Sequence, residues 1–346
     1  MIGATGNVGT SLLRALGSDP SVKEIVGVAR RAPQIRMPKT TWQTADVVDS
    51  DLVPIVRGAD AVVHLAWLIQ PSRDKEAVAR VNVEGSARVF QAAVAAEVPA
   101  LVYASSVGAY SPGPKDRRVD ETWPTEGIKS SYYSRHKVET ERQLDLIERQ
   151  APRMRVVRLR PGLIFKRDAA SGIRRLFAGP FLPSPLVRPD LIPIVPRTER
   201  LVFQAVHSHC VGDAYRRAVV DQEARGAYNI AAEPVLDADE LGRVLKARPV
   251  AVPPRVLRGA AKIAWLSRAQ PTDPSWVDLA LGVPLLDTTR ARKELGWTPR
   301  QGADEALLEL IEGIRQGAGF GTPPLARGTS GPLRVRELLT GVGART

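Results

Sequence analysis

Short runs of apolar residues alternate with segments of helical periodicity through the first half of the chain. The runs are rich in Val, Ile, Leu and Ala and predict strands at 24–29, 41–47, 61–66, 100–106 and 155–162. Helices are expected between them, at Thr10–Leu16, Asp51–Val56, Ala77–Ala96 and Ser131–Arg149. Apolar strands that alternate with helices are typical of a parallel sheet covered on both faces. The sequence therefore predicts an α/β fold with a doubly wound parallel sheet of the Rossmann type.

The pattern of residues changes after Gly162, where a proline-rich stretch predicts an irregular region that caps the substrate. Further strands are expected at 200–207 and 226–231, and helices at Asp237–Leu245, Pro254–Trp265 and Asp304–Arg315. We expect a Rossmann domain for dinucleotide binding over residues 1–165. Residues 166–316 would form a smaller, interleaved C-terminal capping region, from which the strands near 200–207 and 226–231 return to the Rossmann sheet. Residues 317–346 are rich in Gly, Pro and Thr and predict a loosely packed tail.

Three glycines at the start of the chain, Gly3, Gly6 and Gly9, have the spacing of a turn that cradles a dinucleotide. The first permits a tight turn, the second lets backbone approach the pyrophosphate, and the third lets the next helix pack closely. Only Met1 and Ile2 precede the turn, although such a turn normally follows a central strand. We therefore expect the first strand to be truncated at this start.

Tyr133 and Lys137 in "YSRHK" lie one turn apart on one face of a predicted helix. An ammonium beside a phenol favours the phenolate, so the pair predicts a tyrosine whose pKa is lowered toward working pH. Such a tyrosine can exchange a proton with a carbinol or carbonyl while a hydride moves. Ser106 ends a predicted strand 27 residues earlier, where the catalytic groups of such sheets gather.

With these elements the chain resembles the extended short-chain dehydrogenase/reductase family of NAD(P)-dependent epimerases, dehydratases and reductases. The matching pieces run from Gly3 to about Arg315 and include "GATGNVG", "TADV", "VVHLAW", "VYASSVGAY", "YSRHK", "LRPGLIF" and "LGWTP". The resemblance implies that Ser106 binds the substrate oxygen, that Tyr133 is the acid/base, and that Lys137 lowers its pKa and holds the nicotinamide ribose. Tyr132 is a rival to Tyr133 but lacks the spacing to Lys137.

The resemblance also implies the residues that bind the cofactor. The glycine turn would contribute Gly3, Thr5, Gly6, Asn7, Val8 and Gly9. Asp46 and Val47 would flank the adenine, Leu65 and Ala66 would line the cofactor, Asn82 would support the site, and Pro161 and Gly162 would border the nicotinamide.

The end of the second predicted strand, "GVARRAP", indicates which dinucleotide is bound. NAD enzymes usually place an acidic residue there for the ribose hydroxyls. This chain has Ala29 followed by Arg30 and Arg31, and a guanidinium suits a 2′-phosphate. The sequence therefore favours NADP(H) over NAD(H), although an arginine that only stacks on adenine would discriminate neither.

Three functions are compatible with these motifs. The first is an NAD(P)-dependent oxidoreductase acting on a small substrate, with an anionic substrate as one alternative. The second is an epimerase of the nucleotide-sugar type with a retained nicotinamide. The third is a regulator that senses the dinucleotide without catalysis. Val107 and Gly108 follow Ser106 where dehydratases of the family carry an Asp-Glu pair, which argues against dehydration.

The chain's composition narrows the remaining classes. The net charge of +12 comes mainly from scattered arginines, without a nucleic-acid-binding motif, so no nucleic-acid partner is expected. The most apolar stretch is too short to cross a bilayer, and no secretory signal is evident, so we expect a cytoplasmic protein without a membrane partner. His207, His209 and Cys210 are spaced too closely for a standard tetrahedral site, so no metal is expected. The family resemblance implies a possible homodimer through the helices that hold Asn82 and Tyr133.

Overall fold

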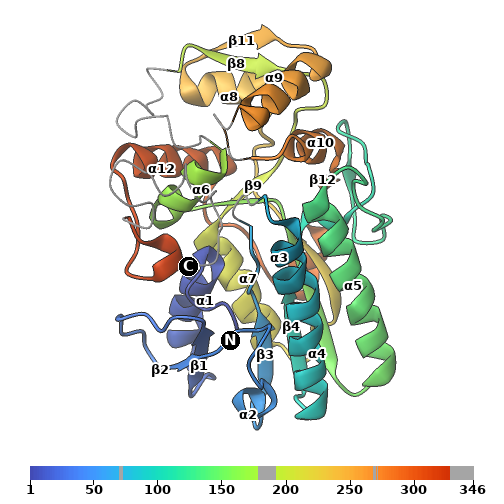
Figure 1. Ribbon diagram of the computed structural model, residues 1–346, viewed down its shortest axis with the longest axis vertical. Coiled ribbons are helices and arrows are strands. Elements are labelled where there is room, and N and C mark those ends of the chain that lie inside the picture. Colours follow the sequence, from blue (N-terminus) through green and yellow to red (C-terminus); the bar gives the residue numbers. More distant parts are fainter. Residues whose placement is uncertain (70–72, 178–191, 268–269, 271, 328–346) are drawn as a thin grey trace.

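The main sheet consists of parallel strands in the order β2, β1, β3, β4, β6 and β10. The computed structural model describes residues 1–69, 73–177, 192–267, 270 and 272–327 (Figure 1). The strands span β1 Ile25–Ala29, β2 Thr40–Thr44, β3 Ala61–His64, β4 Ala100–Ala104, β6 Arg155–Pro161 and β10 Gly226–Ile230. The parallel pairing, with helices between the strands, confirms the predicted α/β fold of the Rossmann type.

Ile2 lies between β1 and β3 and forms a parallel bridge to each of them, at Val28 and at His64. The N–H of Ile2 donates to the Val63 carbonyl at 2.8 Å, and the N–H of Leu65 donates to the Ile2 carbonyl at 2.8 Å. These bonds place the glycine turn that follows at the carboxyl ends of β1 and β3, the edge at which such sheets bind ligands.

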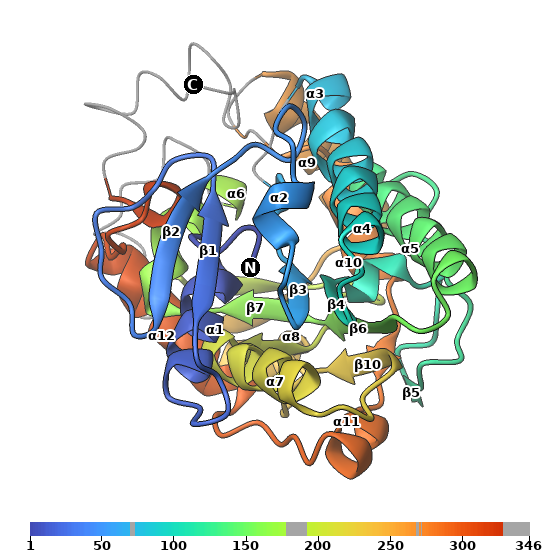
Figure 2. The ribbon, with the colours of Figure 1, turned by 90° about the horizontal axis from the view of Figure 1, so that it is seen from below.

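Two layers of helices cover the sheet, and each buries its own apolar cluster (Figure 2). On one face α1 (Asn7–Gly17) packs against α7 (Ser208–Val220), and on the other α4 (Gly85–Ala95) packs against α5 (Tyr132–Gln150). Val102 of β4 belongs to the first cluster, while its neighbour Leu101 belongs to the second. Strands buried on both faces explain why the sequence shows continuous apolar runs rather than alternation.

The helix predicted at Ala77–Ala96 is interrupted. It is formed by α3 (Lys75–Ala79), a π-helical turn η1 (Arg80–Glu84) and α4. The other short elements of the first half are α2 Val53–Val56, β5 Arg118–Val119 and the 3₁₀ turn η2 Val107–Ala109.

Most of the remaining elements lie at the end of the molecule away from α2, beyond the carboxyl ends of the main strands (Figure 1). There β8 pairs in parallel with β11, α8 and α9 lie beside this small sheet, and α10 contacts α9. The elements after β6 span β7 Leu163–Phe165, η3 Arg167–Ala169, α6 Ala170–Phe177, β8 Ile194–Arg197, β9 Ala205–His207, α8 Ala238–Leu245, β11 Arg248–Ala251, α9 Pro254–Leu266, α10 Ser275–Gly282, β12 Leu285–Leu286, α11 Thr289–Glu294, α12 Ala303–Arg315 and η6 Pro323–Leu325.

The two strands expected to return to the main sheet behave differently. β10 pairs with β6 in the main sheet, whereas β9 pairs with β7 in a separate sheet, so the placement expected for 200–207 is wrong. The two segments meet at Gly162, where a Cβ would lie 2.5 Å from the Gln204 carbonyl oxygen, and the N–H of Leu163 donates to that oxygen at 3.0 Å. The backbone of Gln204 thus lies against the chain just after β6 ends, and β9 follows β7 from there.

Part of the segment expected to be a loose tail is described. The Thr322 hydroxyl donates to the Thr5 carbonyl at 2.8 Å, and Leu325 is buried. Residues 328–346 lie outside the described residues. In the part of the chain that the structure describes, no helix combines the length and apolarity needed to cross a membrane.

Candidate active site

The glycine turn sits directly on the end of β3. Gly3 has a φ of +83°, and a Cβ there would lie 2.5 Å from the Ala66 nitrogen and 2.7 Å from the Leu65 carbonyl carbon. A Cβ at Gly9 would lie 2.5 Å from the Ala4 carbonyl oxygen. At Gly6 a Cβ would meet only the Gly3 carbonyl oxygen, at 3.5 Å. The protein's own packing therefore explains the first and third glycines, and it leaves space over Gly6.

The amino end of α1 follows this turn and fits an anion. Gly6 is the N-cap residue and supplies no side-chain acceptor for the first N–H groups of the helix. The Asn7 Oδ1 atom is buried and has no hydrogen-bond partner among the described residues. Beneath the turn, the buried Lys166 ammonium donates to the Asn7 carbonyl at 3.1 Å and to the Thr10 hydroxyl at 2.8 Å. A pyrophosphate over Gly6 would thus meet free N–H groups and a positive charge below them.

The residues expected at the adenosine end lie at the carboxyl ends of β1 and β2. Arg30 and Arg31 are exposed, and neither has an ion pair or a side-chain hydrogen bond within the described part of the chain. The Asp46 carboxylate accepts from the Val48 N–H at 2.9 Å. Val47 is buried, and its carbonyl accepts from Arg88 Nε at 3.0 Å. The structure therefore gathers these four expected residues along one edge, with the two arginines free to meet a ligand.

Ser106 and Tyr133 come together at the carboxyl end of β4. Against the larger effect of burial, the Ser106 side chain lowers the pKa of the Tyr133 phenol, and both side chains lie against Gly108, where a Cβ would be 3.4 Å from the Ser106 Oγ. The ring lies so close to Gly108 that a Cβ there would be 2.9 Å from Tyr133 Cε1, so "SSVG" needs its glycine for this approach. The rival Tyr132 points elsewhere, and its hydroxyl accepts from the Trp276 indole at 3.4 Å. Only Tyr133 of the two has Ser106 as its partner.

Lys137 lies one helical turn after Tyr133 but makes no direct bond to the phenol. Its ammonium donates to the Ala104 carbonyl at 2.6 Å and to the Tyr103 hydroxyl at 3.3 Å, and it lies 5.9 Å from the centre of the Tyr133 ring. Burial raises the pKa of Tyr133 to about 12, against the opposing effect of the Ser106 side chain. Burial also lowers the pKa of Lys137 well below its ordinary value. The pKa of the phenol is therefore shifted in the direction opposite to the one expected from the sequence, because desolvation by burial is the largest effect on it.

Asn82 and the Pro161–Gly162 pair hold backbone around this centre. Asn82 is buried; its Oδ1 accepts from the Leu68 N–H at 2.7 Å, and its Nδ2 donates to the Leu68 carbonyl at 3.1 Å. It fixes the loop that leaves β3. The N–H of Gly162 donates to the Ile230 carbonyl at 3.0 Å, so that pair borders the next strand end.

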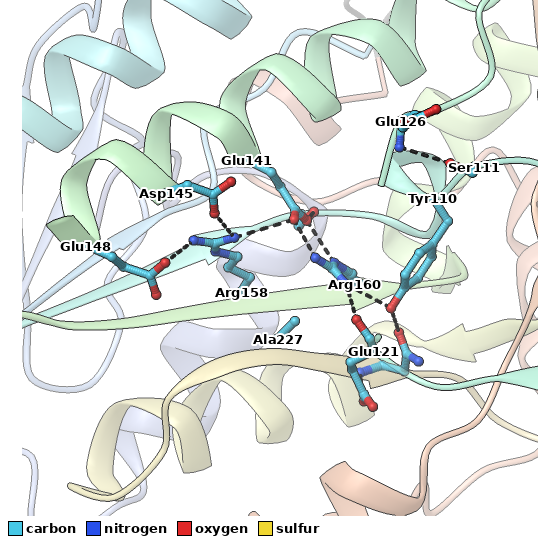
Figure 3. A network of polar contacts seen from close by, with 12 residues as sticks. Tyr110, Ser111, Glu121, Glu126, Glu141, Asp145, Glu148, Arg158, Arg160 and Ala227 are labelled. Carbon is cyan, nitrogen blue, oxygen red and sulfur yellow. Dashed lines mark hydrogen bonds and ion pairs between the residues drawn. The ribbon is translucent and has the colours of Figure 1, made fainter. Parts of the chain in front are cut away.

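Sequence reasoning missed a buried charge network that extends the same face of α5 (Figure 3). Glu141 follows Lys137 by one turn and binds Arg160 of β6 through two bonds of 2.8 and 2.5 Å. The Ser105 hydroxyl also donates to Glu141, and Arg160 donates to the Tyr110 hydroxyl at 3.0 Å. Burial alone would raise the pKa of Glu141, but these bonds and the neighbouring guanidinium groups hold it below its ordinary value. The four-residue spacing of Tyr133, Lys137 and Glu141 was the sequence signal that could have placed Glu141 on the same helix face.

Two indoles beside Tyr133 were also missed. Trp67 follows β3 and Trp276 lies on α10, and both rings contact the Tyr133 ring. The motif "VVHLAW" contained the first, whereas no local pattern pointed to the second.

The side chains of His207, His209 and Cys210, in and just after β9, contact protein groups. His207 Nε2 lies 3.2 Å from the Glu309 carboxylate, His209 Nε2 lies 3.1 Å from Arg14, and the Cys210 thiol accepts from the Arg300 N–H at 3.3 Å. Among the described residues no group of His, Cys, Asp and Glu side chains could hold a metal ion.

Known proteins resemble both the sequence and the fold. Over 321 residues the chain is 26% identical to the uncharacterized protein Rv2047c of Mycobacterium tuberculosis, and the match covers 92% of this chain but 30% of that protein. The chain thus spans about a third of the length of that curated relative. It is 37% identical over 105 residues to the L-arabinose 1-dehydrogenase (NAD(P)(+)) of Haloferax volcanii, covering 30% of this chain and 39% of the relative.

Solved structures share the fold over most of the chain. The UDP-glucose 4-epimerase of Thermus thermophilus, solved as a complex with NAD, superposes with a TM-score of 0.65 at 20% identity, covering 91% of this chain and 97% of that one. Residues 1–169 match the family model described as the NAD dependent epimerase/dehydratase family. These residues are therefore similar to the NAD-dependent epimerase/dehydratase family, and the chain shares its α/β fold with the solved NAD-bound epimerase.

Proposed function

We propose that the chain is an NAD(P)-dependent oxidoreductase that moves a hydride between a nicotinamide and a carbonyl or carbinol carbon of a small substrate. One observation carries the proposal: Tyr133 and Ser106 lie together against Gly108, on the sheet edge where the glycine turn packs against the end of β3. A proton donor, a second hydroxyl and a dinucleotide cradle thus share one edge of the sheet. The dehydrogenase relative from Haloferax volcanii supports the same reaction class.

In this mechanism Ser106 and Tyr133 hold the substrate oxygen, and Tyr133 gives it a proton during reduction or takes one during oxidation. The bound nicotinamide supplies or accepts the hydride. Lys137 is the third catalytic group, because its buried side chain brings the Nζ atom to 5.9 Å from the centre of the Tyr133 ring. Glu141 acts as a positioning residue, since its carboxylate ties Ser105, the neighbour of Ser106, to Arg160.

The cofactor preference is the finer part of the proposal, and we expect NADP(H) over NAD(H). The acidic residue typical of NAD enzymes is absent from the end of β1, where Ala29 is followed by two exposed arginines. Replacing Arg30 and Arg31 by serine should weaken NADP binding by about tenfold for each phosphate bond lost. The affinity for NAD should stay nearly constant, and titration with both dinucleotides measures the difference.

An epimerase with a retained nicotinamide is the second candidate, favoured by the NAD-bound UDP-glucose 4-epimerase of similar fold. The two candidates differ in their products. The oxidoreductase changes the absorbance at 340 nm in step with substrate, whereas the epimerase interconverts two sugars without net change in the dinucleotide.

The Tyr133→Phe variant tests either enzyme, because it removes the proton donor while it keeps the ring. Turnover should fall by about a thousandfold while the dinucleotide still binds. Tyr132→Phe is the matched control, and it should keep most of the activity. A Tyr133→Phe protein with full turnover would instead support a regulator that binds the dinucleotide without this catalysis.

The same proposal includes a homodimer through α4 and α5. These helices pack side by side on one face of the sheet, and Leu146 of α5 is 57% exposed there. Sedimentation of the wild type and of Leu146→Glu would test this, because a buried charge should dissociate the dimer.

A further inference from the structure

The Tyr133 ring is flanked by two indoles from distant parts of the chain. The Trp276 ring lies 5.1 Å from it, centre to centre, at an interplanar angle of 38°. The Trp67 ring lies 6.0 Å away with its edge toward the tyrosine, at 77°. The face of Trp67 also covers the Lys137 ammonium, which is 3.3 Å from the ring centre. Aromatic rings therefore surround the group that would exchange the proton.

Trp276 is fixed in place by the elements around it. Its indole N–H donates to the Tyr132 hydroxyl, and Asp273, just before α10, forms an ion pair of 3.1 Å with Lys75 of α3. Ile128 and Leu279 belong to an apolar cluster against which Tyr133 and Trp276 pack. The indole is thus a fixed wall of the capping region rather than a side chain that a polar substrate could push aside at no cost.

Two cations beside α10 are bound to main-chain carbonyls. Arg200 donates to the Gly113 carbonyl at 2.7 Å and to the Leu281 carbonyl at 3.2 Å. Lys115 donates to the Val202 carbonyl at 2.6 Å and to the Ala280 carbonyl at 3.0 Å. A nucleotide diphosphate needs guanidinium or ammonium groups that are free to bind its oxygens. Arg200 and Lys115 would have to lose their hydrogen bonds to these backbone carbonyls before they could bind a diphosphate.

We propose that the substrate carries its reactive carbonyl or carbinol on a flat aromatic or conjugated ring, which stacks on the indole of Trp276. The inference rests on the proposed oxidoreductase function and names its substrate class. In the reducing direction the hydride goes to the carbonyl carbon and the Tyr133 proton to its oxygen, so an aryl ketone and NAD(P)H give an aryl carbinol and NAD(P)⁺. Ring stacking favours planar substrates over saturated ones of the same size.

A second feature of Trp67 agrees with a ligand at this place. Its indole nitrogen is buried and has no acceptor among the residues that the structure describes. A buried donor of this kind normally has a partner, and an oxygen on the ring of the substrate would provide one.

The test compares acetophenone with cyclohexyl methyl ketone, which have the same skeleton and differ in ring unsaturation. With the full chain and NADPH, kcat/KM should favour acetophenone by about tenfold, which corresponds to about 1.4 kcal/mol. Trp276→Phe should keep the preference, and Trp276→Leu should abolish it. Trp42→Leu is the matched control, because Trp42 lies on the edge strand β2 and should leave the preference unchanged.

The outcomes separate the two proposals. Reduction of both ketones at equal rates, or a preference that survives Trp276→Leu, would overturn the aromatic subsite while the oxidoreductase function stands. If neither ketone reacts, calorimetry of the two matching alcohols with the NADP⁺ complex decides, and equal or absent binding overturns the subsite. Tighter binding of UDP-glucose than of either alcohol also overturns it. A chain that binds no dinucleotide refutes the function itself.

Discussion

Replacing Glu141 by glutamine should destabilise the protein strongly, although the two side chains have nearly the same shape. The Glu141 side chain is 3% exposed and its partner Arg160 is 5% exposed. Removing one charge from such a buried pair leaves the other uncompensated, which costs about 3–5 kcal/mol. The amide keeps one oxygen for the guanidinium, so we expect the lower end, about 3 kcal/mol. For 346 residues this corresponds to a fall in Tm of about 4 °C.

The contribution of Glu141 to the free energy of unfolding should depend on pH in a defined direction. The folded pKa of Glu141 lies below its ordinary value of 4.5, because the guanidinium groups outweigh the effect of burial. The stabilisation by this carboxylate is therefore complete above about pH 4.5 and is lost as the pH falls through the folded pKa. The difference between wild type and Glu141→Gln should accordingly narrow in acid. Urea unfolding followed by circular dichroism, at about pH 7 and about pH 4, measures it.

Glu148→Gln is the matched control for this network. Glu148 lies on the same helix and pairs with Arg158 at 2.5 Å, but its side chain is 40% exposed. Solvent screening limits such a pair to about 0.5 kcal/mol. If Glu141→Gln cost no more than Glu148→Gln, or cost the same at both pH values, the assignment of a buried and unreplaceable charge would be refuted.

Three further changes test the backbone and the cation beneath the turn. Gly3→Ala should abolish dinucleotide binding, because a Cβ would overlap the end of β3. Gly58→Ala is its control: Gly58 has a φ of +75° but open space around it, so this change should lower the free energy of unfolding by only about 1 kcal/mol in thermal unfolding and keep dinucleotide binding. Asn82→Ala leaves the Leu68 N–H and carbonyl without their side-chain partner, so it should lower the free energy of unfolding in urea by about 1–3 kcal/mol. A smaller loss of stability would mean that water replaces the amide. Burial lowers the pKa of Lys166 from 10.5 to about 8, so this group should add about 3 kcal/mol of stability as the pH rises between these values, because the unfolded state alone keeps the proton. The stability of Lys166→Met should therefore rise less than that of the wild type by this amount, and parallel curves would contradict the assignment.

Local patterns in the sequence were sufficient for the main sheet and the helices beside it. The apolar runs at 61–66 and 100–106 became β3 and β4, and the periodic segment after Ser131 became α5. Each of these elements is buried over its whole length or along one stripe, so its periodicity records its environment. The elements that were missed, such as α7 and α10, have weaker signals. In α7 the segment "SHCVGDAYRRAVV" mixes polar and apolar residues around a close contact of Gly212 with Ser11, which a local pattern does not reveal.

The sequence by itself determined the motifs whose parts lie within one turn or one loop: the glycine spacing, the Tyr133–Lys137 pair on one helix face, and the arginines after β1. Only the tertiary structure decided what surrounds them. Trp67 and Trp276 meet at Tyr133 because the loop after β3 and the helix α10 converge there. That convergence buries the phenol and raises its pKa to about 12, where the helical spacing alone predicted the opposite direction. Desolvation depends on everything packed around a group, and so it cannot be read from the residues one turn away.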